Sequence, residues 1–131
     1  MKTTSLESVW SPRLLSVLRI IAALIFMAHG TQKILGFPTG ASPEMFSLPW
    51  IAGVLELFGG ALLVLGLFVR PVAFVLSGLM ASAYWIAHAP KSVFPALNGG
   101  DAAILYCFVF LYFVAAGGGV WSLDNLLGKS R

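Results

Sequence analysis

Hydrophobic residues form four long runs along this chain, separated by short polar stretches rich in proline and glycine. The runs cover residues 14–35, 49–69, 71–89 and 101–116. Each is close to the ~20 residues that an α-helix needs to cross the hydrocarbon core of a bilayer. Because backbone polar groups in lipid must be satisfied within the segment, four transmembrane helices are the simplest interpretation.

Turn residues support these boundaries. Pro49 and Pro71 stand at predicted helix starts, where the missing amide donor costs nothing, and the glycines at 117–119 end the fourth helix. The sequence therefore predicts an all-α fold, a four-transmembrane-helix antiparallel bundle that forms a single integral membrane domain over residues 1–131. A short interfacial C-terminal helix is predicted over 122–128, with Ser122 as its N-cap.

Composition strengthens the membrane interpretation. Of the 131 residues, 59% are hydrophobic and only 10% are charged, whereas a soluble domain carries about 25% charged residues. The net charge of +3 comes from basic residues placed singly at segment ends, which indicates no nucleic-acid partner. Cys107 is the only cysteine, so it cannot form an internal disulfide, and it is interpreted as a structural thiol.

The basic residues also predict an orientation. With both termini in the cytoplasm, the outer side of the membrane holds only Lys33 and Lys91, and Arg19 is expected to snorkel towards the inner interface. The inner side then holds the other basic residues, namely Lys2, Arg13, Arg70, Lys129 and Arg131. The positive-inside rule therefore favours an N-in, C-in topology.

One acidic residue, Glu56, lies within the second run. An unpaired carboxylate there costs about 2.5–3.5 kcal/mol on insertion scales, so it must find a partner or stay protonated. The predicted topology places His29 at a similar depth and Lys33 one turn further out, so we expect Glu56 to bond to one of them. Gly53 and Gly60 share a helical stripe with Glu56 and would let the neighbouring helix approach closely.

The topology brings most of the intramembrane polar groups to the outer half of the bundle. His29, Lys33 and Glu56 are the candidate catalytic residues, since they can hydrogen-bond to ring oxygens and pass protons. The candidate substrate-binding residues nearby are Phe26, Tyr84, Trp85, His88, Asn98 and Asp101. Structural interpretations stay open: the ion pair can simply lock helix packing, and the residues at the rim can be turn, helix-start or interface residues.

Several short motifs, in this order, resemble those of the DoxX family of small four-helix bacterial membrane proteins. They are H-G-x-x-K at His29 to Lys33, E-x-x-G-G at Glu56 to Gly60, G-x-x-x-R at Gly66 to Arg70, N-G-G-[DE] at Asn98 to Asp101, and W-S-L-D at Trp121 to Asp124. One departure is Asp101, where members of the family often carry Glu. The resemblance implies a multi-pass protein of the bacterial cytoplasmic (inner) membrane, related to the small subunit of thiosulfate:quinone oxidoreductase.

The favoured function is a quinone- or quinol-interacting redox subunit, with quinone as the ligand and a redox partner protein or a homo-oligomer as further partners besides lipid. The alternative is a non-catalytic scaffold or accessory subunit of a larger redox or stress-response complex. A metal site made of His29, Glu56 and His88 is less favoured, because Lys33 beside it would repel a cation. Transport is weaker still, because four helices leave little room for alternating access.

Overall fold

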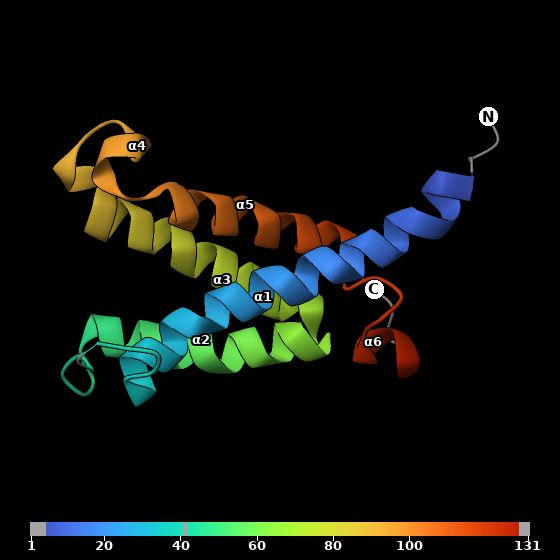
Figure 1. Cartoon of the computed structure of the whole chain (residues 1–131), viewed down its shortest axis with the longest axis horizontal. Coiled ribbons are helices and arrows are strands. Elements are labelled where there is room, and N and C mark those ends of the chain that lie inside the picture. The colour runs from blue at the N-terminus through green and yellow to red at the C-terminus, as the bar shows by residue number, and fades with distance from the viewer. Residues whose placement is uncertain (1–4, 41, 129–131) are drawn as a thin grey trace.

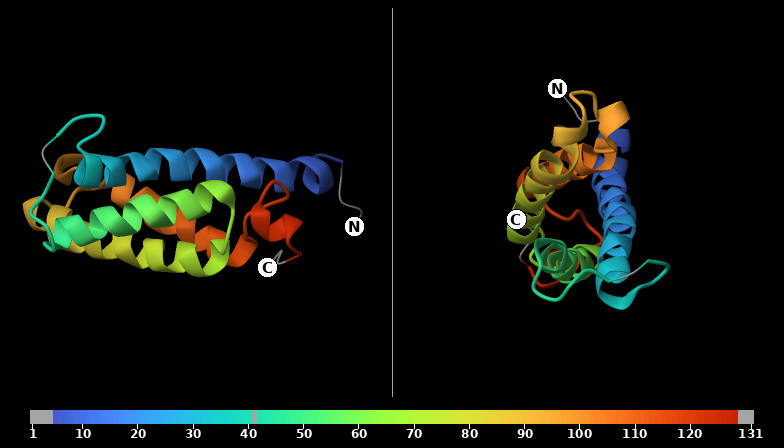
Figure 2. Two further views of the ribbon diagram at one scale, coloured as in Figure 1. Left: turned by 90° about the horizontal axis from the view of Figure 1, so that it is seen from below. Right: turned by 90° about the vertical axis from the view of Figure 1, so that its left-hand side faces the viewer.

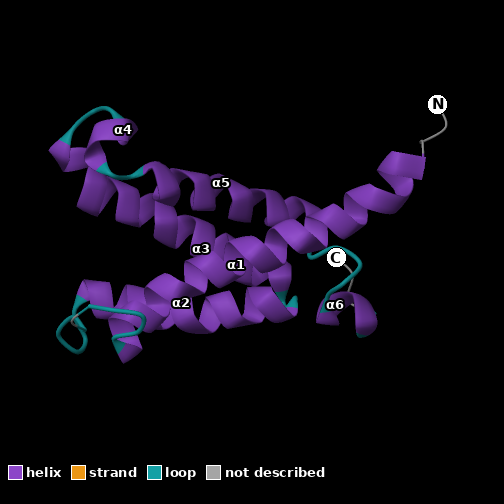
Figure 3. Ribbon diagram, viewed as in Figure 1, coloured by secondary structure: helices purple, strands orange, loops and turns teal. Residues whose placement is uncertain are grey.

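The structure, a computed structural model, describes residues 5–40 and 42–128, and within these ranges the chain is helical and contains no strand (Figures 1 and 3). The all-α prediction is therefore confirmed. The α-helices are α1 (Ser11–Leu35), α2 (Leu48–Leu65), α3 (Val69–Ala83), α4 (Pro95–Asn98), α5 (Asp101–Ala116) and α6 (Leu123–Leu126). A π-helical turn at Leu6–Trp10 leads into α1, and α3 continues through helical turns at Tyr84–His88 and Ala89–Lys91.

Three helical stretches of the described chain are long and apolar enough to cross a membrane: Leu6–Leu35, Leu48–Leu65 and Val69–Lys91. Helix α5 is also apolar but shorter. Large hydrophobic side chains such as Phe58, Phe74 and Phe108 are exposed on the outside of the bundle. Exposed apolar surface on this scale suits contact with lipid rather than with water.

The long helices form two pairs. Helix α1 packs along α2, and α3 packs along α5, while α1 and α5 touch only sparsely (Figure 2). The two pairs diverge towards the end of the bundle that carries α4, and α6 and the start of α1 lie at the opposite end (Figure 1). We refer to these as the α4 end and the α6 end.

Glycines allow α1 and α2 to pack closely, as the sequence predicts for Gly53 and Gly60. A Cβ atom added at Gly60 would lie 2.9 Å from the Cβ of Met27, and one at Gly53 would lie 2.7 Å from the Cβ of Lys33. The tightest approach between these two helices is at Gly30, which the sequence analysis places in the H-G-x-x-K motif but does not link to helix packing. The bare backbone at these positions lets side chains of one helix lie against the other, which is how small residues support helix packing in membranes.

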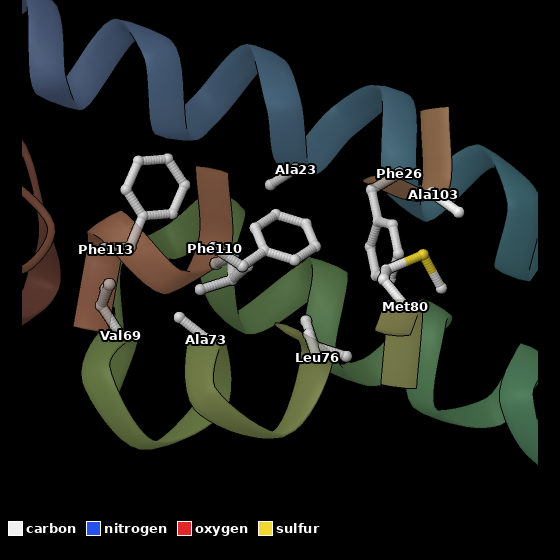
Figure 4. Close-up of a cluster of buried hydrophobic side chains, with 10 residues drawn as sticks. Ala23, Phe26, Val69, Ala73, Leu76, Met80, Ala103, Phe110 and Phe113 are labelled. Carbon is white, nitrogen blue, oxygen red and sulfur yellow. The ribbon is translucent and has the colours of Figure 1, made fainter. Parts of the chain in front are cut away.

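The hydrophobic core lies between the two pairs and combines three phenylalanine rings with aliphatic side chains and Met80 (Figure 4). Phe26 of α1 packs edge-to-face on Phe110 of α5, with ring centroids 4.9 Å apart. Phe110 and Phe113 are fully buried, as are Leu63 and Ala73 of the helices that face them. Edge-to-face ring pairs of this kind add to the stabilisation from burial alone.

The junction between α2 and α3 differs from the prediction. Helix α2 ends at Leu65 rather than at 69, because Gly66 takes the left-handed conformation (φ 74°) that ends a helix. The turn occupies 66–68, and α3 begins at Val69, so Pro71 lies inside the first turn of α3. Proline is tolerated there because the first amides of a helix have no partner within it.

The expectation that Arg19 snorkels to the interface is wrong. Its side chain is 0% exposed. The guanidinium donates to the carbonyl oxygens of Leu63 (2.8 Å), Trp121 (2.7 Å) and Gly118. A guanidinium presents five donors in a fixed fork, so one side chain joins the end of α2 to the segment that follows α5.

The C-terminal segment is fixed to the bundle through a buried carboxylate. Ser122 caps α6 by accepting from the amide of Asn125, as predicted. The neighbouring Asp124 is buried, and its two oxygens accept from the amides of Phe68 (2.8 Å) and Val69 (2.9 Å) at the start of α3. The tail therefore does more than lie on the membrane surface: it caps another helix.

Candidate functional site

A cavity of about 260 Å³ opens between the two helix pairs towards the α4 end. It brings together five of the nine candidate residues, from α1, α2 and the end of the α3 stretch. They are Phe26, His29, Lys33, Glu56 and His88. The remaining lining comes from α3 and α5 and from Gly99 between α4 and α5, namely Met80, Ala83, Gly99, Ala102, Ala103 and Tyr106.

Glu56 and Lys33 form an ion pair across the α1–α2 interface. Lys33 Nζ lies 2.8 Å from Glu56 Oε1, and the side chains are 32% and 3% exposed, respectively. The close approach at Gly53, one turn before Glu56, provides room for the Lys33 stem. Of the two partners considered for Glu56 from sequence, Lys33 is the one that bonds to it.

The second carboxylate oxygen of Glu56 is buried and has no hydrogen-bond partner among the described residues. Most buried polar atoms in proteins are paired, and leaving one unpaired costs about 1–3 kcal/mol. An unpaired acceptor on a residue that lines a cavity is a feature of binding sites, since a ligand that donates a hydrogen bond removes that cost.

Aromatic rings form one side of the cavity. Tyr106 of α5 meets Phe26 edge-to-face with centroids 5.2 Å apart and lies perpendicular to the His29 ring at 6.3 Å. Its ring lines the cavity together with Glu56. Sequence reasoning missed Tyr106, because α5 is apolar on all sides and its sequence gives no sign of which face turns inward.

His29 and His88 occupy different parts of the cavity. The His29 side chain lies at the edge of the cavity and is exposed, so this ring is accessible from outside the bundle. His88 is half-buried, and its Nδ1 lies 3.1 Å from the carbonyl oxygen of Asn98. The hydrogen bond fixes the His88 ring against the loop that closes the α4 end.

The other four candidates lie outside the cavity lining. Asn98 is buried and organises the loop, because its amide donates to Tyr84 Oη (3.1 Å) and Ser92 O (3.0 Å) while its oxygen accepts from the amide of Gly100. Tyr84 and Trp85 instead line a separate apolar depression of about 280 Å³ beside Cys107. Asp101 is exposed in the first turn of α5.

The arrangement suits a small ring with polar substituents better than a cation. Within residues 5–40 and 42–128, no three His, Cys, Asp or Glu side chains are grouped closely enough to hold a metal ion. Pockets for drug-sized molecules measure about 300–1,000 Å³, so a cavity of about 260 Å³ matches a single ring. It offers an aromatic wall, a carboxylate, an ammonium and two imidazoles.

Comparison with known proteins adds the following. A family model described as DoxX matches residues 14–89, which include the ion pair and both histidines. A Haemophilus influenzae protein, described only as an uncharacterized protein, is 45% identical over 129 residues, covering 92% of this chain and 95% of its own length. No solved structure matches the chain.

Proposed function

The chain belongs to the DoxX family, as its motifs predict, and from that premise we propose that it is a quinone- or quinol-binding subunit of a membrane redox system. The observation that carries the proposal is Glu56, which lines a ring-sized cavity, pairs with Lys33 through one carboxylate oxygen and leaves the other oxygen buried and unpaired. Phe26 and Tyr106 supply aromatic surface for a ring, and His29 gives an imidazole that can donate or accept a hydrogen bond.

The cavity suits a ligand that carries an apolar tail. Because His29 is exposed at the edge of the cavity, a head group can enter from the side of the bundle while its tail stays among the lipid chains.

Oxidation of a hydroquinone releases two protons and two electrons. Glu56 and His29 are the proposed proton acceptors, and the electrons pass to a partner redox protein, since a chain with one cysteine has no disulfide of its own to reduce.

Binding of a short-tailed ubiquinone, in its oxidised and reduced forms, to the purified protein in lipid nanodiscs tests this proposal. We expect the wild type to bind at least one form. Glu56→Gln should weaken that binding by about tenfold or more, as the loss of a hydrogen bond to a charged group predicts. His29→Ala should weaken it by about two- to tenfold, as the loss of a neutral hydrogen bond predicts. Both variants should keep their helical circular dichroism spectrum.

The matched control is Glu44→Gln, which makes the same chemical change at an exposed loop position and should bind like the wild type. Wild-type affinity in both cavity variants would refute the proposal. If the wild type binds neither form and Glu56→Gln only lowers the melting temperature, the accessory-subunit alternative is favoured instead. The bridging of α1 and α2 by the ion pair is the observation that supports that alternative.

We further propose that the chain crosses the bacterial inner membrane four times, with both termini in the cytoplasm. The start of α1 and α6 lie at the same end of the bundle (Figure 1), and Arg13 and Arg70 lie towards that end. Fusion of green fluorescent protein to the C-terminus should give fluorescent cells, and alkaline phosphatase inserted into the loop at 36–47 should be active. The reverse pattern would place the cavity on the cytoplasmic side.

A further inference from the structure

Building on the proposed function, we propose that the cavity selects the reduced hydroquinone over the oxidised quinone. Glu56 lines the cavity, and its buried, unpaired atom Oε2 is a hydrogen-bond acceptor. The two redox forms of the head group have nearly the same size and shape but differ in hydrogen bonding. A hydroquinone carries hydroxyl groups that donate, whereas a quinone carries carbonyl groups that only accept.

The pairing with Lys33 uses one oxygen of the Glu56 carboxylate. Lys33 Nζ donates to Oε1 at 2.8 Å, and the second oxygen of an ion-paired carboxylate can only accept. The Glu56 side chain is only 3% exposed, so water has little access to compensate the second oxygen. No donor within residues 5–40 and 42–128 reaches that oxygen.

Three other polar groups of the cavity do not discriminate between the two forms. Lys33 can donate to a quinone carbonyl, but it can equally donate to a hydroquinone oxygen, which also accepts. The Tyr106 hydroxyl and the His29 ring can each donate or accept. The carboxylate repels one form, because a quinone carbonyl placed against it sets two acceptors face to face.

The expected selectivity follows from the value of one hydrogen bond to a charged group. A site that pairs its buried acceptor with a ligand hydroxyl rejects the analogue without that hydroxyl, because the acceptor stays unpaired. For one such bond, about 10- to 100-fold tighter binding of the hydroquinone is expected.

The test measures dissociation constants of the wild type in nanodiscs, under anaerobic conditions, for three forms of one short-tailed ubiquinone. These are the quinone, the hydroquinone and the hydroquinone dimethyl ether, in which both hydroxyl groups are capped. We expect the hydroquinone to bind at least about tenfold more tightly than the other two. The ether needs no mutation, so this arm of the test is independent of whether a variant folds.

Glu56→Gln provides the second arm. A carboxamide offers a donor as well as an acceptor, so the preference for the hydroquinone should disappear or reverse, whereas Glu44→Gln should keep the wild-type ratio. Equal or tighter binding of the quinone by the wild type would overturn the selectivity while leaving the proposed function intact. Binding of none of the three molecules would overturn the proposed function itself.

Discussion

Replacing Arg19 with methionine is expected to remove most of the folded protein in mild detergent. Three backbone carbonyl groups lose a hydrogen bond from the guanidinium, although Gly118 O still accepts from Ser16 Oγ and Leu63 O from the amide of Gly66. The carboxylate of Asp124 also loses a positive charge that attracts it. Removing one member of a buried ionic network typically costs about 3–5 kcal/mol, a large share of the ~5–15 kcal/mol by which a domain is stable. The measurement is the melting temperature together with the monodisperse fraction in size-exclusion chromatography.

Arg13→Met is the matched control. Arg13 lies near the same end of α1, and its guanidinium stacks 5.4 Å from the centre of the Trp10 ring. This change should lower the melting temperature only slightly, because a cation–π contact at an accessible site contributes about 0.5–1 kcal/mol. Arg19→Lys should behave like Arg19→Met, since an ammonium cannot reproduce the fork that reaches three carbonyls. Similar melting of Arg19→Met and wild type would contradict the proposed role.

Gly30→Ala is expected to separate α1 from α2 despite adding a single methyl group. The new Cβ would lie 2.5 Å from the backbone nitrogen of Leu57 and 2.9 Å from the carbonyl oxygen of Gly53. Both atoms belong to the backbone, so the helices must move apart rather than repack a side chain. Overpacking of this kind costs about 1–3 kcal/mol, and the Lys33–Glu56 pair lies beside it, so hydroquinone binding should weaken as well.

Gly78→Ala makes the same substitution where it should do no harm. Gly78 is exposed in the middle of α3, and an added Cβ would meet nothing within 4 Å. The change should leave the melting temperature unchanged or raise it, because alanine is about 1 kcal/mol more favourable than glycine inside a helix. If Gly30→Ala melts like Gly78→Ala, the close contact at Gly30 does not hold the helix pair together.

The sequence predicts the helices well where the hydrophobic pattern is uninterrupted. The fourth run, residues 101–116, coincides with α5, because a polar loop precedes it and three glycines follow it. The ion pair of Glu56 was also predictable, since a lone acid in an apolar run requires a partner and Lys33 lies at a suitable depth. The junction of α2 and α3 was not, because the apolar run continues through Gly66, whose conformation alone ends the helix.

The site itself was predicted only in part, for a physical reason. Residues on α1 and α2 could be placed because Glu56 needs a partner, and a bond to His29 or Lys33 fixes which faces of the two helices meet. Tyr84 and Trp85 share the depth of the cavity but point elsewhere, and depth gives no information on rotation about the helix axis. The roles of Arg19 and Asp124 escaped prediction because each bonds to backbone groups, and backbone groups leave no trace in the amino-acid pattern.

The contacts of Arg19 also bear on how the protein is made. Arg19 is synthesised 99 and 102 residues before two of its three acceptors, Gly118 and Trp121. Until the segment after α5 docks, α1 therefore carries, within an apolar run, a guanidinium that lacks two of its hydrogen bonds, and an incompletely paired charge there is costly. Docking of that segment completes the solvation of a charge carried by the first helix.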